Sequence, residues 1–111
     1  SPLIGKFQVN DHTILSVSAF DGSIGDELSN LNRWRTQLGL EQLESVGDSF
    51  QSYTLNSSQI RFVTLTNTQQ YFVIYWITVG DRHIFNKFVS TGPVSKDLMD
   101  AFIESQSWSS I

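Results

Sequence analysis

Apolar and polar residues alternate along several short segments of the chain, which is the pattern of strands that bury one face. Leu15, Val17 and Ala19 alternate with Ser16 and Ser18 in a segment at residues 14–20, and the turn "NDH" separates it from a strand at residues 6–9. Both alternating sets are apolar at residues 71–79, which is typical of a central strand covered on both faces. Further strands are predicted at residues 50–55, 60–66 and 83–89.

Two other segments follow a helical period. The first helix is expected to begin near Asp26 and to end near Leu38, because Gly39 suits the left-handed position after a helix. The second follows "STGPV", and its buried face is expected to contain Val94, Leu98, Ala101, Phe102 and Ser105. The order of elements predicts one α+β domain over residues 1–111, in which an antiparallel sheet of about five to six strands packs against two helices.

An arginine interrupts the apolar stripe of the first helix. At 100° per residue, Arg35 falls in the arc formed by Ile24, Leu28, Leu31 and Leu38, with Trp34 at its edge. A buried guanidinium is costly unless its donors are matched. The favoured interpretation is a structural arginine that bonds strand-end carbonyls or a carboxylate, with Asn32 satisfying neighbouring backbone. The alternative is an anion or carboxylate site that uses Arg35 and Asn32.

Composition narrows the classes of partner. The net charge is −4, and no cluster of basic residues exists beyond Arg33 and Arg35, so neither nucleic acid nor an anionic membrane surface is an expected partner. The chain has no cysteine, which excludes disulfides and cysteine-bound zinc. The longest apolar run is too short for a transmembrane segment. No signal peptide is visible, and the abrupt start leaves open a leader or a lipid anchor upstream.

Candidate chemistry is sparse, and no cofactor is expected because no phosphate-binding loop or catalytic motif is present. Asp11, His12, Asp81 and His83 are weak metal ligand candidates, on the condition that their two turns meet at one end of the sheet. Aromatic residues, among them Trp34 and Trp76, are expected mostly in the core, with a ligand pocket as the alternative. Trp108 is the tryptophan expected to be partly exposed.

The stretch "ILSVSAFDGSIGDELSNLNRWRTQLGL" at residues 14–40 resembles a family of bacterial, often lipoprotein-like, proteins of unknown function. Their pattern is a strand ending S-x-S-x-F, a glycine-rich turn and L-x-N-x-N-R-W-R-x-Q-L-G-L. A Thr-Gly-Pro turn before the final helix also matches, at Thr91, Gly92 and Pro93. The chain departs from the pattern at "DGSIGDE", where members have Pro-Gly and a Gly-Gly pair. The arrangement of elements is also similar in outline to the PsbP-like fold.

The resemblance to the lipoprotein-like family implies a bacterial protein of the periplasm or cell surface, and the PsbP-like outline implies a binding or assembly role. Because no catalytic motif is present, the expected protein is a non-enzymatic binding or assembly module. It would present a sheet edge or the helix with Arg33 to a partner, since Arg33 is expected on the solvated face. The alternatives are a small-molecule or anion-binding domain whose pocket includes Arg35, Asn32 and Trp76, and a metal-dependent hydrolytic enzyme.

Overall fold

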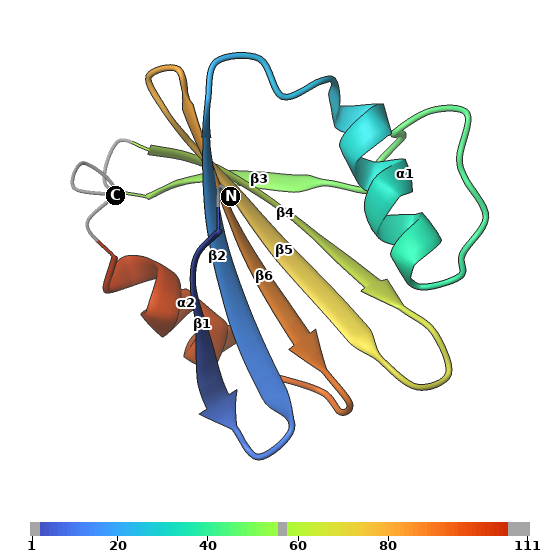
Figure 1. Cartoon of the computed structure of the whole chain (residues 1–111), viewed down its shortest axis with the longest axis vertical. Coiled ribbons are helices and arrows are strands. Elements are labelled where there is room, and N and C mark those ends of the chain that lie inside the picture. Colours follow the sequence, from blue (N-terminus) through green and yellow to red (C-terminus); the bar gives the residue numbers. More distant parts are fainter. Residues whose placement is uncertain (1–2, 56–57, 107–111) are drawn as a thin grey trace.

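The computed structural model describes residues 3–55 and 58–106, and Figure 1 shows their path. Trp108 lies outside these described residues. The described elements are β1 (Leu3–Asn10), β2 (Thr13–Asp21), α1 (Glu27–Gln37), β3 (Gln51–Leu55), β4 (Ser58–Thr66), β5 (Tyr71–Val79), β6 (Arg82–Ser90) and α2 (Lys96–Glu104). Six antiparallel strands and two helices confirm the predicted α+β fold. Neither described helix is long and apolar enough to cross a membrane.

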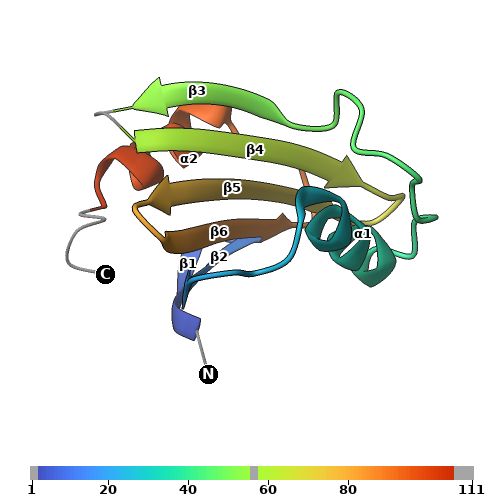
Figure 2. The same cartoon turned by 90° about the horizontal axis from the view of Figure 1, so that it is seen from above.

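The strands form one sheet in the order β1-β2-β6-β5-β4-β3. From β3 to β6 the chain runs as a meander of neighbouring strands, and β6 then pairs with β2 from the first hairpin. Between β2 and β3 the chain crosses one face of the sheet through α1 and enters the far edge (Figure 2). This crossover packs α1 against residues of β4, β5 and β6.

β5 lies inside the sheet and is buried on both faces, as its sequence predicts. Val73, Tyr75 and Ile77 belong to the core beneath α2, together with Met99 and Ile103 of that helix. Phe72, Ile74 and Trp76 belong to a second core beneath α1. The two helices therefore cover opposite faces of the sheet (Figure 2).

The buried face of α1 includes Leu31 and Leu38 of the predicted arc together with Trp34, which was expected at the edge of that arc. The Trp34 side chain is buried, whereas Arg35 is half-buried at the margin of the helix. The Trp34 ring meets Phe85 and Trp76 edge-on at centroid distances of 5.5 and 6.5 Å, so the bulky indole occupies the centre of the contact. Gly39 has a φ of +72° directly after the cap residue Leu38, as predicted.

The expected buried face of α2 was only partly correct: Val94 and Phe102 pack against the core beneath the helix, but they are not its centre. Met99 and Ile103 are the buried residues, whereas Leu98 is 37% exposed and Ala101 is exposed. The Tyr75 hydroxyl, which comes from the sheet below, donates a hydrogen bond of 2.9 Å to the carboxylate of Asp100. Asp100 therefore faces the sheet, next to its buried neighbour Met99.

Candidate functional site

Two polar side chains of α1 fasten the loop that follows the helix. The Asn32 amide donates to the Leu43 carbonyl at 3.0 Å and accepts from the Leu43 N–H at 2.8 Å. Arg35 Nε donates to the Glu41 carbonyl at 2.6 Å. Arg35 thus bonds a carbonyl of the following loop rather than a strand end, and it lines neither of the two cavities described below.

Trp76 does not join Arg35 and Asn32 in a pocket. Its side chain is 7% exposed, and its indole N–H donates to His83 Nδ1 at 3.1 Å. It packs within the aromatic core beneath α1, as the core interpretation of the aromatic residues expected. The pocket proposed from sequence around Arg35, Asn32 and Trp76 is therefore not assembled in this arrangement.

The weak metal ligand candidates lie at opposite ends of the sheet. His12 sits in the β1–β2 turn beside Thr13, whereas His83 in β6 faces Phe20 near the other end of β2. Phe20 lies seven positions after Thr13 along β2, a span of about 23 Å at ~3.3 Å per residue. The condition that the two turns meet does not hold, and no group of three or more potential ligands occurs among the described residues.

A small hollow beside α1 brings together polar side chains from three elements. Ser16 and Ser18 come from β2, Lys87 comes from β6, and Arg33 and Gln37 come from successive turns of α1. Trp34, Phe20, Ile74 and Phe85 supply its apolar wall, and its volume is about 170 Å³. We call this hollow the Arg33–Lys87 pocket.

The strand register explains why these groups converge. Ser16 is paired with Lys6 on β1 and with Lys87 on β6, so the three residues form one row across neighbouring strands. Paired residues in adjacent strands point to the same face, which here is the face that carries α1. α1 packs on this face, and Arg33 lines the pocket from the helix side.

The pocket has an excess of positive charge. Partial burial lowers the pKa of Lys87, and the positive charges of Arg33 and Lys6 lower it further. Within residues 3–55 and 58–106, none of these three cations forms an ion pair, since the described pairs are Arg61 with Glu27, Arg82 with Asp21 and Lys96 with Asp100.

The side-chain contacts of Lys87 are neutral. Its ammonium group donates to the side-chain carbonyl of Gln37 and lies 4.2 Å from the centre of the Phe72 ring. Both contacts stabilise a cation without cancelling its charge. An anion entering the pocket would therefore meet two cationic donors and the hydroxyl groups of two serines.

Sequence reasoning identified Arg33 and Trp34 but missed Lys87, Gln37, Ser16 and Ser18. Lys87 could have been noticed from the sequence, because it is a charged residue inside a predicted strand and Phe88 follows it directly. Ser16 and Ser18 were interpreted only as residues on the solvent-exposed face of their strand. Their convergence depends on the pairing of β2 with β6, which are far apart in the sequence, and this pairing has no local signature.

Comparisons of the chain with models of protein families, with curated proteins and with solved structures find no match. The resemblance to the lipoprotein-like family and to the PsbP-like fold therefore stays a prediction. Six residues that carry this resemblance nevertheless line the Arg33–Lys87 pocket: Ser16, Ser18, Phe20, Arg33, Trp34 and Gln37.

Proposed function

We propose that the protein is a non-enzymatic binding module whose Arg33–Lys87 pocket receives an anionic group of its ligand or partner. The observation that carries this proposal is the pair of cations, Arg33 and Lys87, around one hollow with no carboxylate among its lining residues. A fork-shaped guanidinium and an ammonium suit a carboxylate or phosphate, and both bonds are charge-assisted. The bacterial, extracytoplasmic setting implied by the resemblance is part of the same proposal.

Binding fits this pocket better than catalysis. Its lining residues include no histidine and no carboxylate, so Lys87 has no second acid–base group beside it. The apolar wall of Trp34 and Phe85 offers contact to a hydrophobic body attached to the anion. A carboxylate on a short aromatic or aliphatic body therefore satisfies more of the pocket than a bare ion does.

The test is a titration with 4-methylbenzoate, and in parallel with inorganic phosphate, followed by the ¹⁵N–¹H signal of the Trp34 indole. We expect saturable shifts that weaken as salt is added, because ions screen the attraction. Arg33→Gln and Lys87→Gln should each weaken binding by about tenfold or more, the loss expected when a charged hydrogen-bond partner is removed.

Arg82→Gln is the matched control, because Arg82 is paired with Asp21 at 3.0 Å and does not line the pocket. It should leave the affinity unchanged. Saturation with the carboxylate alone would assign a carboxylate ligand, whereas saturation with phosphate would assign a phosphate-bearing one. If neither anion moves the Trp34 signal, or if Arg82→Gln weakens binding as much as Arg33→Gln does, the proposal is wrong.

A further inference from the structure

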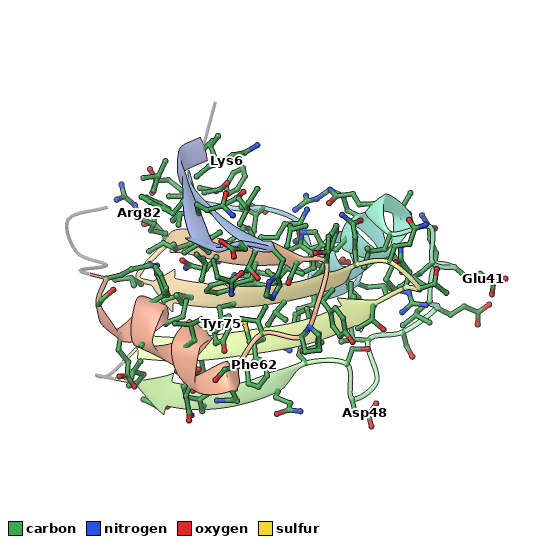
Figure 3. All side chains as sticks on the ribbon, turned by 90° about the horizontal axis from the view of Figure 1, so that it is seen from below. Lys6, Glu41, Asp48, Phe62, Tyr75 and Arg82 are labelled. Carbon is green, nitrogen blue, oxygen red and sulfur yellow. The ribbon has the colours of Figure 1, made fainter. Side chains whose placement is uncertain are left out.

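A second cavity lies on the opposite face of the sheet, beneath the start of α2. Phe62, Tyr75 and Phe88 form its aromatic floor on β4, β5 and β6, and Val94 and Met99 cover it. Figure 3 shows Phe62 and Tyr75 beside α2. The volume is about 250 Å³. An apolar cavity of about 150 Å³ is enough to bind benzene, so this α2 cavity has room for a substituted aromatic ring.

The polar groups around the α2 cavity are mostly occupied by one another. The ammonium of Lys96 is 2.7 Å from the Asp100 carboxylate, which also accepts from the Tyr75 hydroxyl. The Ser90 hydroxyl accepts from Thr13 and donates to the Gly92 carbonyl. Lys96 is the one cation that lines the cavity within the described part of the chain, and its charge is therefore balanced, in contrast to the Arg33–Lys87 pocket.

Two hydroxyl groups at one side of the cavity remain available. Thr64 and Tyr71 both line it, and neither side chain forms a hydrogen bond within the described residues. Thr64 is paired with Val73 and Tyr71 with Thr66, so the two residues are diagonal neighbours on one face of β4 and β5. Thr64 is exposed and Tyr71 is half-buried, which places them at the mouth.

We propose that the α2 cavity binds a small neutral molecule, with an apolar or aromatic body against Phe62 and Phe88 and one hydrogen-bonding group at Thr64 and Tyr71. An anion is disfavoured because Asp100 lies next to Lys96, the only cation among the described residues that line the cavity. A purely apolar molecule would fit the floor but would leave the mouth hydroxyls without a ligand partner. This site is separate from the proposed anion site and does not depend on it.

The experiment uses the fact that Met99 is the only methionine of the chain. A protein labelled with ¹³C at the methionine methyl group gives one signal from inside the cavity. We expect p-cresol to shift this signal saturably through the ring current of its aromatic ring. Toluene, which has the same body without a hydroxyl, should bind about 3–10-fold more weakly, the range for one neutral hydrogen bond.

4-Methylbenzoate is the negatively charged analogue of p-cresol. Because the cavity is expected not to bind an anion, adding 4-methylbenzoate should not change the chemical shift of the Met99 methyl group. Each proposal thus has its own probe and its own reporter, and either can fail alone.

Thr64→Phe should fill the mouth and abolish the p-cresol shift. Thr54→Phe is the matched control, because Thr54 is an exposed β3 residue that does not line the cavity. If Thr64→Phe does not fold, the double variant Thr64→Val and Tyr71→Phe should instead remove the preference for p-cresol over toluene. Absence of a saturable Met99 shift up to the solubility limit of p-cresol would overturn the proposal. A shift that persists in Thr64→Phe would also overturn it.

Discussion

Replacing Lys87 with methionine should raise the free energy of unfolding at neutral pH. The lowered pKa of Lys87 means that its charged form is less stable in the folded chain than in the unfolded one. Methionine keeps most of the stem that packs on Phe72 and removes the charge that Arg33 and Lys6 repel. Part of the repulsion is screened by solvent, so we expect a gain of about 0.5–1 kcal/mol.

The assay is thermal and urea unfolding of the wild type and the variant. A gain of this size corresponds to a rise of roughly 2–4 °C in Tm for a domain of this length. The difference should shrink as pH rises toward 10.5, because folded wild type loses the Lys87 proton first and its stability then rises with pH. It should also shrink in the presence of an anion that saturates the wild type, because the variant binds this anion more weakly.

Lys96→Met is the opposite case, because Lys96 is paired with Asp100 and its removal leaves that carboxylate without its cation. It should lower stability or leave it unchanged. A Lys87→Met protein that is less stable than wild type at pH 7 would refute the reasoning, since the cation would then be matched by a partner in the folded chain.

Three further predictions concern contacts that hold the fold together. Asn32→Ala should lower the free energy of unfolding by about 1–3 kcal/mol in urea, because both hydrogen bonds to the Leu43 backbone are lost. Arg35→Ala should lower the free energy of unfolding by only about 1 kcal/mol, because one hydrogen bond to the Glu41 carbonyl is lost. Anion binding should be unchanged, because Arg35 does not line the Arg33–Lys87 pocket. If the variant no longer binds the anion, Arg35 is part of the binding site. Burial, with Asp100 and Glu104 nearby, raises the pKa of Tyr53 to about 12, so wild type should lose stability between pH 10 and 12 as the unfolded chain ionises. Tyr53→Phe should lose less over that range, and equal losses in an alkaline unfolding series would contradict the assignment.

Local patterns were enough to predict the elements of this fold. The alternation in β2 and the doubly apolar β5 identified strands of different burial, and Gly39 marked the end of α1. The rotation of each helix about its axis was harder to predict from the sequence. In both helices two apolar arcs overlap, and the choice between them depends on the residue beneath, such as Phe85 under Trp34.

The candidate site could be predicted only in part, for a related reason. Arg33 was placed correctly on the exposed side of its helix, because that position follows from the helical period alone. Lys87 lies 54 positions further along the chain and reaches the same hollow only because β6 pairs with β2. A pattern within one element has no information about the register between elements that are distant in sequence.

The pairing of β2 with β6 also has a consequence for the order of folding. The β3–β6 meander consists of neighbouring strands and can form from contacts that are short in sequence, whereas the first hairpin must close a loop of roughly 60 residues to reach β6. Such distant contacts form slowly, so we expect the docking of β2 to be a late step. The Arg33–Lys87 pocket spans this junction, with Ser16 on one side and Lys87 on the other. A bound anion would therefore hold the last-formed junction closed, and it should slow unfolding more than it speeds folding.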